Sequence, residues 1–251
     1  MIPNSIHMIY PVTDKTRPWS FINTLAVTLA CKHHHHGSIY IWTNDEARIP
    51  GDVRAMVTLM VTDLPTHLEG VEIAYPQYIA DVMRLQILSE HGGIYMDTDI
   101  LLQKPLTEFL SEKRLVMSWE TEDRRSISNA LMMSPPDNLF VAEWLRRMPE
   151  AVQSNTWAYG GVVVPAKMAN NPYLNDSCTI LPHTFCCPLD LSQPWLFEPS
   201  LKSQAQQKIR DSHAVHVFET YWRDTIGRIT PAWLEHTDCL LTELGKPLSG
   251  A

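Results

Sequence analysis

Residues 78–102 read YIADVMRLQILSEHGGIYMDTDILL. This stretch joins a helical pattern over 77–91, the pair Gly92-Gly93 and a short apolar strand over 94–96. Two adjacent glycines at the end of a helix allow the chain to turn sharply. A helix that leads directly into a buried strand is the repeating unit of a parallel sheet, so the stretch predicts an α/β fold.

The helix over 77–91 carries two charged residues on its apolar side. At 100° per residue, Asp81 and Arg84 lie on the same arc as Leu85 and Leu88. Burial of an unpaired charge is costly, so these two groups need partners. A salt bridge between them, at the i,i+3 spacing, and a role in holding a ligand are both consistent with the pattern.

The triplet Asp97-Thr98-Asp99 follows the predicted strand. Side chains alternate along a strand, so the two carboxylates are expected on one side, at the carboxyl edge of the sheet where α/β proteins bind ligands. Two converging carboxylates repel each other unless a cation or hydroxyl donors lie between them. Mg²⁺ or Mn²⁺ suits such a pair together with diphosphate oxygens and water. The triplet alone is a weak signal, but with the preceding helix and glycines it becomes specific.

Other segments continue the alternation of strands and helices, in a looser form toward the C-terminus. One helix is expected to have Asp137 as its N-cap, and the terminal helix is expected to open with Pro231. Besides 94–96, strands are predicted over 6–10, 38–43, 114–119, 127–133 and 214–218, and besides 77–91, helices over 19–31, 137–148 and 231–244.

Composition excludes several classes of protein. The chain has 251 residues, 45% of them hydrophobic, which fits one large α/β domain and excludes disorder as its main description. The 20 Lys and Arg residues against 28 Asp and Glu leave a net charge of −8, so no basic excess exists to bind nucleic acid. A phosphate-bearing ligand therefore needs a local partner, such as a metal ion or a single Arg.

The N-terminal residues, the apolar runs and the cysteines indicate the cellular compartment of the protein. Residues 1–7 show no basic and apolar pattern of a secretory signal, and no apolar run approaches the ~18 residues of a membrane span. Five cysteines form an odd, sparse set typical of free thiols. The expectation is a cytoplasmic protein without a transmembrane helix, with peripheral contact to a membrane left open.

Three further segments have no predicted role in metal binding or catalysis. The histidines over 33–36 are predicted to lie in a turn and face solvent, and 157–161 is expected to be a tight turn or a wall of an acceptor site. Cys186 and Cys187 with His183 lack a second spaced pair of ligands, so no zinc site is expected.

The run ADVMRLQILSEHGGIYMDTDI, residues 80–100, resembles the signature of glycosyltransferase family 32, the DXD sugar-binding group. This group includes yeast-type mannosyltransferases, bacterial surface-glycan transferases and, more distantly, the glucosylating domains of clostridial toxins. Ala80 stands where the family usually has Ser. The match is otherwise complete over the motif.

The resemblance extends to weaker motifs elsewhere. Residues 2–10, IPNSIHMIY, are similar to the opening strand of the family, and 40–42 to its second strand. Residues 216–222, HVFETYW, are similar to its closing motif. Tyr10 and Tyr221 replace the commoner Trp and Ser in these motifs.

The resemblance implies a GT-A (Rossmann-like) fold with a mainly parallel sheet flanked by helices, in a single domain over 1–251 with a C-terminal lid. Residues 1–103 would form the nucleotide-sugar-binding half, and 104–251 the acceptor side and the lid. The implied donor is a nucleotide-diphosphate sugar, UDP- or GDP-linked, and the implied acceptor is a glycan in surface-polysaccharide or glycoprotein assembly. The implied cofactor is Mn²⁺ or Mg²⁺.

Roles for the central motif follow from the resemblance. Asp99 would bind the metal directly. Asp97 would contact the ribose or donor sugar, and the metal through water. Asp81 and Arg84 would hold the sugar hydroxyls and the diphosphate. Asp97, Asp99 and Arg84 are thus the expected catalytic residues.

Roles outside the central motif are also implied. His216 would be a further metal ligand, with His213 as the alternative. Tyr10 would stack on the base, or be a core or rim tyrosine, and Asn129 would lie near the donor and acceptor sugars. Trp222 would sit in the lid and donate its indole N–H to the β-phosphate, or simply pack.

The expected reaction retains the anomeric configuration, by same-face attack in which the leaving phosphate helps take the acceptor proton. Two alternatives stay open. One is a phosphotransferase or phosphatase with Asp97 as nucleophile, and the other is a non-catalytic relative that binds a sugar or nucleotide.

Overall fold

The computed structural model describes residues 1–13, 16, 18–34, 36–73, 75–154 and 156–246. Its main feature is a seven-stranded sheet in the order β10-β8-β9-β6-β1-β2-β3. All neighbouring pairs are parallel except those made by β9, which runs antiparallel to β6 and β8. The mainly parallel α/β fold predicted from the sequence is confirmed. The strands are β1 Ser5–Ile9, β2 Ser38–Thr43, β3 Thr58–Val61, β6 Gly93–Met96, β8 Leu115–Trp119, β9 Ile127–Ser134 and β10 Cys178–Leu181.

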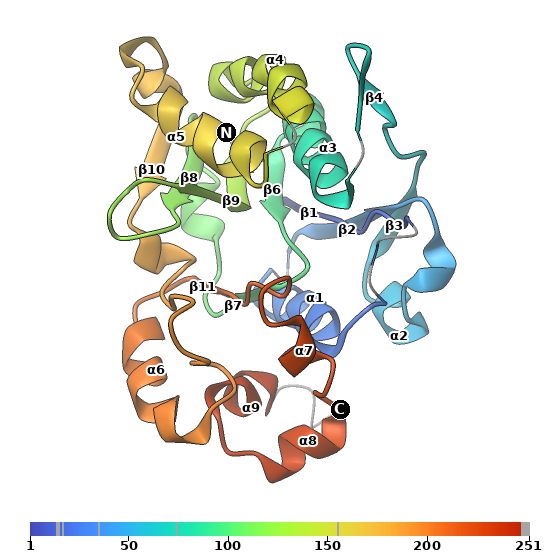
Figure 1. Cartoon of the computed structure of the whole chain (residues 1–251), viewed down its shortest axis with the longest axis vertical. Coiled ribbons are helices and arrows are strands. Elements are labelled where there is room, and N and C mark those ends of the chain that lie inside the picture. The colour runs from blue at the N-terminus through green and yellow to red at the C-terminus, as the bar shows by residue number, and fades with distance from the viewer. Residues whose placement is uncertain (14–15, 17, 35, 74, 155, 247–251) are drawn as a thin grey trace.

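Helices lie on both sides of the sheet (Figure 1). The upper layer in that view is α3 Pro76–His91, α4 Leu139–Ser154 and α5 Val164–Ala169. Below the sheet lie α1 Phe21–His33 and α2 Gly51–Arg54. The C-terminal helices form the lowest part of the view: α6 Lys202–Ile209, α7 Arg223–Ile226, α8 Pro231–His236 and α9 Leu240–Gly245.

Two small antiparallel pairs complete the fold. β4 His67–Leu68 pairs with β5 Val71–Glu72. β7 Ile100–Leu102 pairs with β11 Ala214–His216, so a late segment of the chain lies beside the segment that follows the DXD triplet. No helix in the described part of the chain has the length and apolar character needed to cross a membrane.

Three apolar clusters hold these layers together. Alternation along β1 sends Ile9 into the cluster under α3 and α4, and Met8 into the cluster on the opposite face. A third cluster joins α1 to the C-terminal helices, for example through Leu25 and Leu240. Burial of this apolar surface is the main force that fixes the helices on the sheet.

The Gly92-Gly93 pair makes the predicted sharp turn from α3 into β6. Both residues have positive φ, 64° and 97°. A Cβ at Gly92 would lie 2.7 Å from the ring of Pro136, and one at Gly93 would lie 2.6 Å from the Ser5 hydroxyl. Only glycine fits both demands, and the turn delivers β6 directly to the centre of the sheet.

The N-cap predicted for α4 is wrong by one residue. The side chain of Asn138 accepts hydrogen bonds from the amides of Phe140 and Val141, at 2.9 and 3.2 Å. Asp137 instead has a left-handed backbone, with φ 55°, because the chain turns there out of β9. The helix then continues past Pro149 to Ser154, beyond its predicted end.

The terminal helix predicted over 231–244 is two helices, α8 and α9. Thr237 and Cys239 have extended backbones between them. The break turns Cys239, Leu240 and Leu241 into the third cluster, where each is at most 1% exposed. Burial of these side chains outweighs the continuity of one helix.

The histidine turn also differs from expectation. His36 is exposed as predicted, but His34 is 4% exposed, and a Cβ on Gly37 would clash with its ring. His35 lies outside the described residues. The turn lies close to the backbone of Asn4, just before β1, and this close packing explains why His34 is buried.

Candidate active site

One cavity of about 1410 Å³ opens where β1 and β6 end. It is larger than the ~300–1,000 Å³ typical of a pocket for one small ligand. Most of the site residues predicted from the sequence line it, although they come from distant parts of the chain. They are Tyr10, Asp81, Arg84, Asp97, Asp99, Asn129 and His216.

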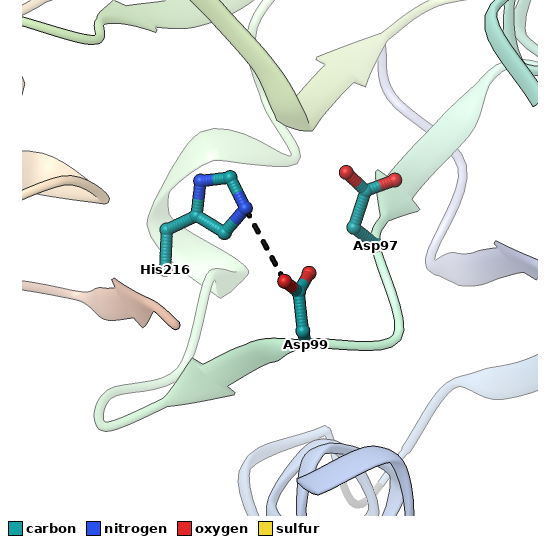
Figure 2. Close-up of side chains that lie close together, drawn as sticks. All are labelled: Asp97, Asp99 and His216. Atoms are coloured by element: carbon teal, nitrogen blue, oxygen red, sulfur yellow. Dashed lines mark ion pairs between the residues drawn. The ribbon is translucent and has the colours of Figure 1, made fainter. Parts of the chain in front are cut away.

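Asp97, Asp99 and His216 face one another across a small space (Figure 2). One ligand atom from each lies within 4.8 Å of the other two. The carboxylates converge for a different reason from the one expected. β6 ends at Met96, and the triplet forms a turn in which the Ile100 amide donates to the Asp97 carbonyl at 3.1 Å, so the chain folds back instead of continuing as a strand.

Strand pairing brings His216 to the acidic pair. β11 runs antiparallel to β7, with His216 opposite Ile100, the residue after Asp99. His216 Nε2 lies 3.5 Å from Asp99 Oδ2, and the same oxygen accepts a 2.8 Å hydrogen bond from the Glu219 amide. Asp99 is therefore oriented by groups about 120 residues away in the sequence.

The charges of Asp99 and His216 support each other. Burial acts to raise the pKa of Asp99, but the nearby His216 and the Glu219 amide hold that pKa below its usual value. Burial acts to lower the pKa of His216, but Asp99 raises it to about 9. At neutral pH the two form an ion pair, and a metal ion could bind at Nε2 only by displacing the proton there.

Arg84 joins helix α3 to the acidic pair. Its Nη2 lies 3.2 Å from Asp81 Oδ1 and 3.5 Å from Asp97 Oδ1, so the i,i+3 salt bridge and a contact to the DXD triplet are both present. Its Nη1 donates to the Asn129 carbonyl at 2.8 Å, and the guanidinium lies over the Tyr95 ring. Burial raises the pKa of Asp97, and Arg84 opposes that shift.

Asn129 and Gly161 fix the carboxylate of Asp81 on helix α3. Asn129 Nδ2 donates to Asp81 Oδ1 at 2.8 Å. A Cβ on Gly161 would lie 2.3 Å from Asn129 Nδ2 and 2.9 Å from both Asp81 oxygens. The backbone at Gly161 therefore comes close to these side chains, but it belongs to a π-helical turn, Tyr159–Val163, and not to the expected tight turn.

Two other predicted residues lie elsewhere. Trp222 lies within the part of the chain that the structure describes, but it does not line the cavity. Its ring packs 5.9 Å from that of Phe197 in the third cluster. Its neighbours Tyr221 and Arg223 do line the cavity. His213 Nε2 lies 2.7 Å from Glu108 Oε1, so the structure places His216, not His213, at the acidic pair.

Tyr10 takes a buried position at the end of β1. It is 7% exposed, it lines the cavity, and its ring meets that of Trp19 edge to face at 4.9 Å. The residue is therefore part of the core and also of the cavity surface, and its stacking on a base stays a prediction.

Sequence reasoning missed several residues of the site. The Tyr95 hydroxyl donates to Asp97 Oδ1. This contact could have been predicted, because residues two positions apart on an extended chain share a face. Asn23 Nδ2 donates to the Thr98 carbonyl at 3.1 Å and to Glu219 Oε2 at 2.8 Å. Asn23 had no such signal, since its partners lie far along the chain.

Comparison with known proteins agrees with this geometry. Residues 24–123 match the family described as "Glycosyltransferase sugar-binding region containing DXD motif". The chain is also similar to "Glucan organizing enzyme 1" of Cryptococcus neoformans var. grubii serotype A, at 25% identity over 209 residues. That match covers 79% of this chain and 55% of the relative, so the chain spans about half the length of that protein.

Two solved structures resemble the whole fold. One is the PaToxG glycosyltransferase, with TM-score 0.51, 16% identity and coverage of 98% of this chain and 87% of the other. The other is apo GlyE, a glycosyltransferase of Streptococcus pneumoniae TIGR4, with TM-score 0.50, 14% identity and coverage of 98% and 64%. The chain thus has the GT-A fold expected for it, and its residues 24–123 match a sugar-binding region that contains a DXD motif.

Proposed function

We propose that the chain is a metal-dependent, retaining glycosyltransferase. It would move a sugar from a UDP- or GDP-linked donor to a hydroxyl of a glycan acceptor, in surface-polysaccharide or glycoprotein assembly. The observation that carries the proposal is the convergence of Asp97, Asp99 and His216 beside Arg84 in one large cavity.

The three convergent side chains fit a divalent ion. Two carboxylates and one imidazole offer oxygen and nitrogen donors, a set that suits Mn²⁺ better than the oxygen-preferring Mg²⁺. Asp99 and His216 would hold the ion directly, and Asp97 through water. When bound, the ion supplies positive charge that stabilises the departing diphosphate.

Arg84 and its partners supply orientation. The guanidinium is buried and held by two carboxylates and two carbonyls, so its position is set before the donor arrives. Fixed charges of this kind stabilise a transition state without reorganisation during the reaction. Asp81 and Asn129, joined by their hydrogen bond, offer acceptors and donors for sugar hydroxyls.

The contacts of the Asp81 and Asp97 carboxylates support same-face attack. Asp81 is engaged by Arg84 and Asn129, and Asp97 by Arg84 and Tyr95. A carboxylate held by such donors is a poor nucleophile, since its charge is already shared. The donor phosphate would then accept the proton of the attacking hydroxyl. The volume of the cavity supports transfer, because it has room for both donor and acceptor.

The test uses Asp99→Asn, which keeps the shape of the side chain but removes its charge. We expect the unaltered protein to release UDP or GDP from one of a set of nucleotide sugars only when Mn²⁺ is present, and the variant to lose both turnover and Mn²⁺ dependence. Asp123→Asn is the matched control, because Asp123 is exposed and its carboxylate interacts with Thr121 and Arg125. Undiminished turnover by Asp99→Asn would overturn the assignment.

The same assays separate the alternatives. Trapping of a phosphoenzyme with a fluoroberyllate would support a phosphotransferase that uses Asp97 as its nucleophile. Donor binding by calorimetry, without turnover on any acceptor or on water, would support a non-catalytic sugar-binding relative.

A further inference from the structure

A thiol lies against the back of the imidazole of His216. Cys187 Sγ is 4.0 Å from His216 Nδ1, while Nε2 on the other side of the ring is 3.5 Å from Asp99 Oδ2. Figure 2 shows Nε2 directed at Asp99 and the second ring nitrogen turned away from both carboxylates. The imidazole thus has the carboxylate on one edge and the sulfur on another.

The position of this sulfur is fixed relative to His216. The Cys187 amide donates to the His183 carbonyl at 2.7 Å, which closes a tight turn. The carbonyl of the adjacent Cys186 accepts from the His216 amide at 2.9 Å. Cys187 is 3% exposed, so the thiol cannot move freely into solvent.

A second restraint acts on the face of the ring. The ring of Phe218 stacks on His216, with 3.9 Å between the ring centroids and 29° between their planes. Phe218 has a φ of 55°, a left-handed conformation that is strained for a bulky residue. Strain of this kind persists where the surrounding structure demands one placement, and it is frequent at functional sites.

We propose that Cys187 is a positioning residue for the metal site: its sulfur accepts the Nδ1–H of His216 and so keeps Nε2 directed at the acidic pair, while Phe218 sets the plane of the ring. The inference rests on the proposed function, because it takes Asp97, Asp99 and His216 as metal ligands. A histidine that binds a metal usually donates its other ring N–H to a nearby acceptor, and this contact fixes its tautomer and orientation. A thiol is a weak acceptor, but it is the group that lies at this nitrogen.

The test measures Mn²⁺ affinity without any nucleotide sugar, by calorimetry and by electron paramagnetic resonance of free Mn²⁺. We expect Cys187→Ala to bind Mn²⁺ about 10-fold more weakly, at the lower end of the loss seen when such a contact is removed. Cys187→Ser offers a hydroxyl acceptor and should recover part of the affinity. Cys186→Ala is the matched control, because Cys186 is fully buried and its sulfur lies within hydrogen-bond distance of Cys187 and Ser128, whereas among the described residues it is the sulfur of Cys187 that lies at His216 Nδ1.

Each outcome bears on the inference. Equal Mn²⁺ affinity in Cys187→Ala and the unaltered protein overturns it and leaves the proposed function standing. An equal loss in Cys186→Ala overturns it as well, since the effect is then general loosening of the turn. If Cys187→Ala does not fold, Cys187→Val decides, because valine fills the space but offers no acceptor: a loss of Mn²⁺ affinity in a protein of unchanged melting temperature supports the inference, and unchanged affinity overturns it. Failure of the unaltered protein to bind Mn²⁺ refutes the proposed function itself, and the inference with it.

Discussion

Arg84 Nη2 lies 3.5 Å from Asp97 Oδ1 and so joins helix α3 to the turn that follows β6. The two residues are 13 positions apart in the sequence, and the Gly92-Gly93 turn between them reverses the chain. The contact shows why the Asp-x-x-Arg helix and the DXD triplet occur together in one motif. The helix supplies the cation that pairs with a partly buried acidic residue at this edge of the sheet.

Removal of the Arg84 charge should destabilise the protein. Arg84→Gln leaves the carboxylates of Asp81 and Asp97 without their buried cation, and loss of one partner of a buried pair costs about 3–5 kcal/mol. Urea unfolding measures the change. Asp81→Asn combined with Arg84→Gln should lose less than the sum of the two single variants, because the double variant removes one uncompensated charge. A loss below about 1 kcal/mol for Arg84→Gln would show that the pair is not buried as described.

A methyl group at position 161 should disturb the site directly. Gly161→Ala places a Cβ 2.3 Å from Asn129 Nδ2, so the hydrogen bond from Asn129 to Asp81 must shift. We expect donor turnover to fall by at least about 10-fold and stability to fall by about 1–3 kcal/mol from overpacking. Gly51→Ala is the control, since the nearest atom is the end of the Arg54 side chain at 3.9 Å. Similar activity in the two variants would contradict the close packing at Asp81.

His7 should make the fold sensitive to acid. Burial lowers the pKa of His7 to about 4, and His91 adds to the shift. The Trp42 indole donates to His7 Nδ1 at 3.2 Å, a bond that needs this nitrogen unprotonated. Because the unfolded chain takes up the proton below about pH 6.5 and the folded chain only near pH 4, the contribution of His7 to stability is full above pH 6.5 and falls by up to about 3 kcal/mol toward pH 4.

Unfolding free energies at several pH values measure this effect. His7→Gln should flatten the slope between pH 6.5 and 4, whereas His236→Gln, at an exposed site, should leave it unchanged. A slope in His7→Gln as steep as in the unaltered protein would assign the acid sensitivity to other groups.

The two candidate histidines should separate clearly in a metal titration. Saturating Mn²⁺ at about 100 times its Kd stabilises a protein by about 2.7 kcal/mol, which a thermal-shift assay detects. We expect His213→Ala to keep the rise in melting temperature on Mn²⁺ addition, because His213 pairs with Glu108 away from the acidic pair. His216→Ala should lose most of it. The reverse pattern would move the metal site.

Trp157 is expected to contact the acceptor. Its side chain is 64% exposed yet lines the cavity, and aromatic rings offer apolar surface to sugar rings. Trp157→Ala should raise the KM for the glycan acceptor by about 10-fold, a loss of roughly 1.4 kcal/mol, while release of the donor sugar to water stays unchanged. Tyr173→Ala is the matched control, because Tyr173 is 90% exposed and lies outside the cavity lining. Equal acceptor KM values would place the acceptor elsewhere.

Much of the fold was predictable because its signals are local. The periodicity of α3, the Gly92-Gly93 turn and the short strand β6 each depend on neighbouring residues, and the structure has all three. Errors arose where distant packing decides local geometry. The break between α8 and α9 depends on burial of Leu240 and Leu241 against other helices, which no nearby residue announces.

The sequence by itself determined the α/β class, the Asp-x-x-Arg helix and the acidic triplet at the sheet edge, because residues within about 20 positions set helix phase, turn and strand end. Only the tertiary structure decided which histidine joins Asp99, because the pairing of β7 with β11 joins segments more than a hundred residues apart. Trp222 shows the same limit: packing against Phe197 outside the cavity lining, not its motif, sets its place. Long-range pairing and burial depend on the whole folded chain, so spacing along the sequence could nominate these residues but not place them.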